Sequence, residues 1–95
     1  MEVLRPKEIE THPGDSVVRW ARRQLQIARD ILDNPGGGLL FATQTIGQVT
    51  AALSERDAAR WESVVALLDR AEDAAVRRAF DTARQLLDEA AGNLS

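Results

Sequence analysis

The side chains that could carry out chemistry are few and lie far apart in the sequence. His12 is the only histidine, and it stands next to Pro13 and Gly14, which interrupt helical structure. A catalytic base needs a positioned partner and a metal site needs several oriented ligands, and the sequence places neither beside His12. The chain has no cysteine for a disulfide, a thiolate site or a nucleophile. We therefore expect no catalytic residues, no metal and no cofactor, and predict that the chain is not an enzyme.

Two other patterns each resemble one part of an active site, but the other residues that such a site needs are missing from the sequence. The acidic pairs Glu72–Asp73 and Asp88–Glu89 are adjacent positions, which point about 100° apart on a helix and do not share a proton. The glycines 36–38 lack the Lys-Ser/Thr that follows a phosphate-binding loop, and no strand precedes them. We interpret the acids as solvated charges and the glycines as a turn between helices.

A row of arginines is the first candidate for binding. The row follows the polar side of the helix expected over residues 16–34, and an aromatic ring lies at its edge. Guanidinium groups bind carboxylates and phosphates. The alternative is an ordinary solvated face that is partly paired with Asp30 and Asp33. The candidate partner-binding residues of this helix are Arg19, Trp20, Arg22 and Arg23.

The second candidate is a segment without charge. No Asp, Glu, Lys, Arg or His occurs from Asn34 to Ser54, although the flanking segments are rich in charge. Apolar residues recur in this segment at the spacing of a helix face, at Leu39, Ala42, Ile46, Val49 and Leu53. A surface helix normally carries charges on its solvent side. We therefore predict a central helix or one that contacts another chain, with partner-binding candidates Leu40, Phe41, Gln44 and Gln48.

An alternative function comes from the segment at about 45–61. Gln48–Leu53 reads Gln-Val-Thr-Ala-Ala-Leu, and after Ser54 a second helix would lead to Arg60-Trp61, which resembles a helix-turn-helix. The resemblance implies a small DNA-binding transcriptional regulator. Glu55 and Asp57 would stand where DNA phosphates approach, and the net charge of the chain is −3. Nucleic acid is therefore not the expected partner.

The elements that position these residues are predicted to be helices. Residues 1–14 form an irregular N-terminal arm and residues 15–95 a helical bundle domain. After the helix over 16–34, capped by Asp15 or Ser16, a second helix is expected over 39–53. Ser54–Asp57 is similar to a capping box that begins a third helix.

The apolar stripe after Ser54 stays in phase as far as Ala90, so residues 55–91 could form one long helix. Glu72 falls within the stripe, where a buried charge is costly. A corner near residues 70–74 would bring Glu72 to water and create a fourth helix. We favour the corner, although the sequence leaves one helix or two open.

Together these patterns predict an all-α fold, a small antiparallel bundle of three or four helices. The expected core comprises Leu25, Ala28, Leu32, Ile46, Val49, Val65 and Leu68. The predicted function is that of a non-enzymatic protein–protein interaction module or small helical subunit that acts through helix-face contacts. The expected partner is a protein, which includes a second copy in a homo-oligomer. No apolar run is long enough for a membrane span and no secretory signal is evident, so we expect a cytoplasmic protein and no membrane partner.

Overall fold

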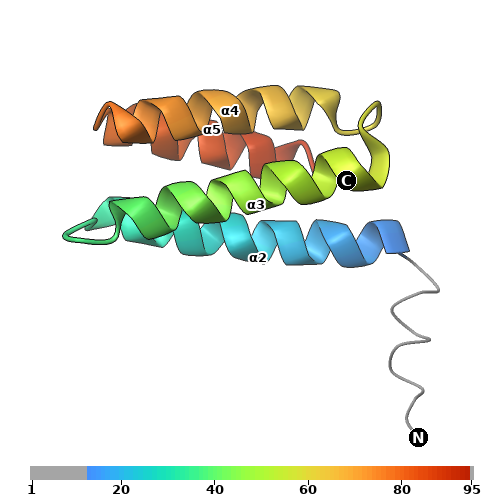
Figure 1. The fold of residues 1–95 in the computed structure, drawn as a ribbon, viewed down its shortest axis with the longest axis horizontal. Coiled ribbons are helices and arrows are strands. Elements are labelled where there is room, and N and C mark those ends of the chain that lie inside the picture. The colour runs from blue at the N-terminus through green and yellow to red at the C-terminus, as the bar shows by residue number, and fades with distance from the viewer. Residues whose placement is uncertain (1–12, 95) are drawn as a thin grey trace, which may run out of the picture.

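The computed structural model describes residues 13–94, which form a bundle of four helices and contain no strand. The helices are α2 (Pro13–Asp33), α3 (Leu39–Asp57), α4 (Glu62–Val76) and α5 (Phe80–Gly92). Consecutive helices run antiparallel, with α2 and α3 in one layer and α4 and α5 in the other (Figure 1). Each helix packs against the next, and α2 also packs against α5. The predicted all-α bundle is confirmed, with four helices.

Helix α2 begins earlier than the sequence predicted. It starts at Pro13 instead of Ser16, so the predicted capping positions, Asp15 and Ser16, lie within the helix and not before it. Proline suits a first helical turn because its missing N–H is not needed there and its φ angle is already helical. Residues 1–12, with His12 and most of the expected arm, lie outside the described residues.

Helix α3 continues past the point where the sequence predicted a new start. The expected capping box at Ser54 is wrong, because α3 runs without a break to Asp57. No glycine or proline interrupts this segment, and Leu53 remains fully buried. The carboxylate of Asp57 accepts a hydrogen bond from the Arg60 backbone N–H at 3.1 Å. Asp57 therefore stabilises the turn after α3 and does not cap a helix that begins at Ser54.

The corner between α4 and α5 exists, but it lies at residues 77–79 and not at 70–74. Arg78 adopts a left-handed φ of 64°, and the Ala79 N–H donates to the carbonyl of Ala74 at 2.8 Å. Glu72 does not force a break, because it is only half-buried at the side of α4. Helix α4 therefore continues to Val76, and N–H groups of the turn after it bond to the carbonyls of its last turn.

Apolar side chains from all four helices share one core. Every predicted core residue except Val65 is buried, and Val65 is half-buried against the core while its neighbour Val64 is buried. Trp61 lies just before α4 and is 2% exposed, with the Arg60 guanidinium 4.3 Å from its ring centre. Leu94, beyond the end of α5, is also buried. This core holds α2 and α3 side by side and fixes the surface between them.

Candidate functional site

The outer surface of α3 carries apolar side chains and no charge over most of its length. Leu40 is 68% exposed and Phe41 is 58% exposed. At 100° per residue, five exposed positions between residues 40 and 51 and the partly exposed Gly47 fall on one side of the helix, about 17 Å from first to last. We call this surface the α3 face; its members are Leu40, Phe41, Gln44, Gly47, Gln48 and Ala51.

The polar side chains on the flanks of α3 are satisfied within the helix. The hydroxyls of Thr43, Thr45 and Thr50 each donate to a carbonyl in the preceding turn, at 2.9, 2.8 and 3.1 Å. Thr43 and Thr45 are buried and leave no unpaired group at the contacts with the rest of the bundle. Gln44 and Gln48 are exposed, and their amides bond to no other described residue. These two amides are therefore available to a partner on the α3 face.

The arginine row of α2 is divided by the fold. Arg22 donates from Nη2 to the carbonyl of Leu94 at 2.6 Å, and Arg29 donates from Nε to Asp88 at 2.7 Å. The hydrogen bond and then the charge of Asp88 raise the pKa of Arg29 above its ordinary value. These two arginines tie α2 to α5 and to the chain after it. Arg22, a predicted partner-binding residue, is thus engaged with its own chain.

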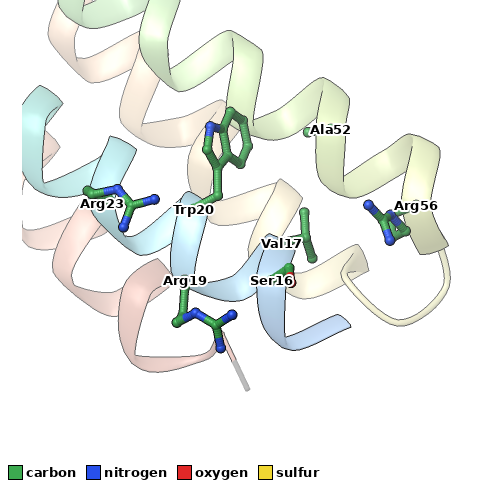
Figure 2. A pocket seen from close by; sticks show the side chains of 7 residues that line it. All are labelled: Ser16, Val17, Arg19, Trp20, Arg23, Ala52 and Arg56. Carbon is green, nitrogen blue, oxygen red and sulfur yellow. The ribbon is translucent and has the colours of Figure 1, made fainter. Parts of the chain in front are cut away.

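Arg19, Trp20 and Arg23 instead line an open groove between α2 and α3, with a volume of about 460 Å³. Figure 2 shows Trp20 standing between the two helices, with Arg23 to one side of it and Arg56 at the far end. We call this the arginine groove; it is lined by Ser16, Val17, Arg19, Trp20, Arg23, Ala52 and Arg56. Within residues 16–94, no ion pair joins its three arginines to a carboxylate.

Sequence reasoning assigned Arg56 to the start of a third helix and so missed its place in the groove. With α3 running to Asp57, Arg56 follows Ala52 by one helical turn on the same flank. The only available signal was the absence of glycine and proline after Leu53, which permits the helix to continue. The charge-free segment was recognised, but the position of Arg56 in the groove just beyond it was not.

The α3 face and the arginine groove adjoin each other. The positions of Phe41, Gln48 and Ala52 differ by seven and then four residues, so the three lie along one side of α3, and Ala52 on that side lines the groove with α2. On α2, Ile27 remains 39% exposed two turns after Trp20. A single surface therefore runs along α2 and α3, apolar and uncharged at one end and rimmed by guanidinium groups at the other.

A second groove, between α4 and α5, is chemically different. It has a volume of about 490 Å³ and contains carboxylates and guanidinium groups together. One pair within it, Asp73 and Arg77, is already matched at 3.0 Å. Its lining therefore mixes positive and negative side chains, whereas the charged residues that line the arginine groove are all positive. Its lining residues are Asp69, Arg70, Asp73, Ala74, Arg77, Ala79, Thr82 and Leu86.

Neither groove, as the described residues line it, contains a histidine or a cysteine. Across residues 13–94, no three or more His, Cys, Asp or Glu side chains gather as a metal site would require. None of the four helices combines the length and the apolar character needed to cross a membrane. The helix break that the helix-turn-helix alternative requires at Ser54 is also absent.

No known protein family matches this sequence, and no curated protein or solved structure is significantly similar to it. A function for the chain must therefore come from the chemistry of its own surface.

Proposed function

We propose that this chain is a non-enzymatic protein–protein interaction module, or a small helical subunit of a larger assembly, that binds through helix faces. The observation that carries the proposal is the exposure of Leu40 and Phe41 on the charge-free α3 face. Scattered exposed hydrophobic residues are ordinary on protein surfaces. Two adjacent ones on a surface with no charge match the centre of an interface, where charged residues are depleted and aromatic residues enriched.

The expected gain from covering these residues is large enough to matter. Full burial of a Leu or Phe side chain is worth about 1.5–3 kcal/mol. Leu40 and Phe41 retain 68% and 58% of their exposure, so complete coverage would contribute about 1–2 kcal/mol each. The side chains project from a helix that the core already holds, which lowers the ordering cost of binding. The pair is thus suited to act as the anchor of an interface.

The same surface gives less support to the competing functions. An enzyme would need a cluster of oriented acids, bases or metal ligands, and residues 13–94 present no metal-ligating cluster. The DNA-binding alternative has lost the helix break on which its recognition helix depended. The partner that remains favoured is a protein, which can be a second copy of this chain or a different one.

The test compares two glutamate substitutions at equally exposed hydrophobic sites. Phe41→Glu places a charge on the α3 face, and Val76→Glu places one at the end of α4, where Val76 is 61% exposed. Sedimentation velocity measures self-association, and affinity capture from the cells that make the protein measures foreign partners. We expect the complex to be lost in Phe41→Glu and kept in Val76→Glu, with unchanged circular dichroism in both. A parent chain that is monomeric at high concentration, with captured proteins identical for both variants, would refute the proposal.

A further inference from the structure

We infer that the arginine groove binds an acidic amphipathic segment of a partner protein. Carboxylates of that segment would pair with Arg19, Arg23 and Arg56, and an apolar side chain would lie on Trp20. This inference rests on the proposed function and names the partner chemistry for one end of the same surface.

The first support is charge that has no partner within the described chain. Elsewhere on the bundle, Arg29 pairs with Asp88 at 2.7 Å and Arg84 pairs with Asp33 at 3.3 Å. The three groove arginines come from two helices and lie at different edges of the groove (Figure 2), and none of them is paired to a carboxylate within residues 16–94. A guanidinium group recognises a carboxylate through parallel hydrogen bonds. The groove therefore presents the complement of an acidic segment.

The two acids that flank Arg56 on α3 do not line the groove. Glu55 adjoins Arg56 in sequence and so points about 100° away from it around α3. Asp57 accepts a hydrogen bond from the Arg60 N–H in the turn after the helix. Neither carboxylate lines the groove, whose charged members are all arginines.

The second support is the apolar floor between those charges. Val17 and Ala52 line the groove with Trp20, whose ring packs against the core on one side and is partly exposed on the other. Half-buried tryptophans of this kind often anchor protein interfaces. The volume of about 460 Å³ lies within the usual range for binding pockets, which suits one or two inserted side chains. A purely anionic ligand would leave this floor uncovered.

The spacing of the basic groups indicates the form of the segment. Arg19 and Arg23 lie one helical turn apart, so their side chains are neighbours on α2. A helix with acids four residues apart would present carboxylates at a matching separation. From Ala52 the surface continues along α3 to Phe41, about 17 Å away. A partner helix of about three turns would therefore cover both ends of the surface.

A protein segment fits these observations better than a nucleic acid does. Nucleic-acid binding proteins carry an extended basic surface, whereas this chain has a net charge of −3 and an apolar groove floor. Three arginines around a tryptophan are a local feature and would contact few phosphates. Duplex DNA is therefore a comparison probe in the test.

The test measures binding of labelled probes to the full chain by fluorescence anisotropy. The main probe is a helical peptide with Glu at every fourth position on one side and Leu on the other. A second peptide has Gln in place of each Glu, and the third probe is a short DNA duplex. We expect the Glu peptide to bind about tenfold or more tightly than the Gln peptide, with weaker binding at higher salt.

Two sets of substitutions remove equal charge from different places. Arg19→Gln, Arg23→Gln and Arg56→Gln together empty the groove of charge. The matched control set, at exposed positions on α4 and the corner after it, is Arg70→Gln, Arg77→Gln and Arg78→Gln. We expect the groove variant to lose about tenfold or more in affinity for the Glu peptide and the control variant to lose little.

The tryptophans supply an independent readout. Trp61 is 2% exposed, so a change in intrinsic fluorescence on peptide binding should come from Trp20. Trp20→Phe should abolish that change while the circular dichroism stays the same. A fluorescence change that survives Trp20→Phe would overturn the placement of the apolar side chain.

The remaining outcomes separate this inference from the proposed function. If the groove variant and the control variant lose equal affinity for the Glu peptide, the binding depends on net charge and not on the groove, which would overturn the inference. If the DNA duplex binds more tightly than the Glu peptide, the inference of a protein ligand is overturned and the favoured ligand becomes a nucleic acid. No binding of either peptide, while partner capture still depends on Phe41, would overturn the inference and leave the proposed function standing. If neither peptide binds and partner capture does not depend on Phe41, the inference and the proposed function are both overturned.

Discussion

Replacement of Leu25 by alanine tests the packing that holds α2 against the rest of the bundle. Leu25 is 2% exposed and belongs to the common core. The substitution removes three methyl or methylene equivalents, worth about 2.4 kcal/mol at about 0.8 kcal/mol each. A residual cavity of about 50 Å³ would add about 1.2 kcal/mol. We therefore expect Leu25→Ala to lower the free energy of unfolding by about 3–4 kcal/mol.

Ile27→Ala is the matched control, because it removes the same number of carbons from the same helix. Ile27 is 39% exposed, and its removal opens to solvent instead of leaving a closed cavity. Its expected cost is about 1–1.5 kcal/mol. A domain of 95 residues is stable by about 5–14 kcal/mol, so both variants should remain folded enough to measure.

The assay is urea denaturation followed by circular dichroism, with the midpoint and slope fitted for each variant. Leu25→Ala should shift the midpoint at least twice as far as Ile27→Ala, with no change in slope. A loss below about 0.5 kcal/mol for Leu25→Ala, or a larger loss for Ile27→Ala, would show that the assigned core face of α2 is wrong.

Four further predictions concern a glycine within α3, the turn before it, an ion pair between α2 and α5, and nucleic acid. Gly47→Ala should raise the free energy of unfolding by about 0.5–1 kcal/mol, because nothing lies within 4 Å of the added Cβ and alanine favours a helix interior. Gly38→Ala should lower it by about 1–3 kcal/mol in the same urea titrations, because its Cβ would lie 2.9 Å from Ile31 Cγ2 and 3.2 Å from the Pro35 carbonyl oxygen. A double-mutant cycle with Arg29→Gln and Asp88→Asn should show a favourable coupling that shrinks as salt is added, since both side chains are partly exposed. Duplex DNA should not bind below micromolar concentration at about 0.15 M salt in a gel-shift assay, and tighter binding would revive the DNA-binding function.

Part of the candidate site could be predicted from local patterns. The charge-free α3 segment and the outward placement of Leu40 and Phe41 follow from residue type and the period of a helix. The edge position of Trp20 on α2 follows in the same way. Such properties depend on neighbours within a few positions, so the sequence carries them directly.

The ends of the helices were harder to predict, because capping signals compete with simple continuation. Ser54 resembled an N-cap, yet α3 continues through it while Leu53 and Trp61 are buried on either side of the turn. The corner after α4 lies at Arg78 and not beside Glu72, because a half-buried glutamate at the side of a helix has no need of a break. Local sequence signals are compatible with several helix ends, and the packing of the core determines which of them is observed.

The sequence by itself determined the helical class, the amphipathic α2 and the uncharged character of α3, because residue type and spacing alone produce these properties. Only the tertiary structure decided which arginines of α2 bond to distant parts of the bundle and which line the groove. Arg22 bonds to the carbonyl of Leu94, 72 positions away, whereas Arg56 joins Arg19 and Arg23 around one groove. A local sequence pattern does not encode such tertiary arrangements, because they depend on how antiparallel helices bring distant residues together around a shared core.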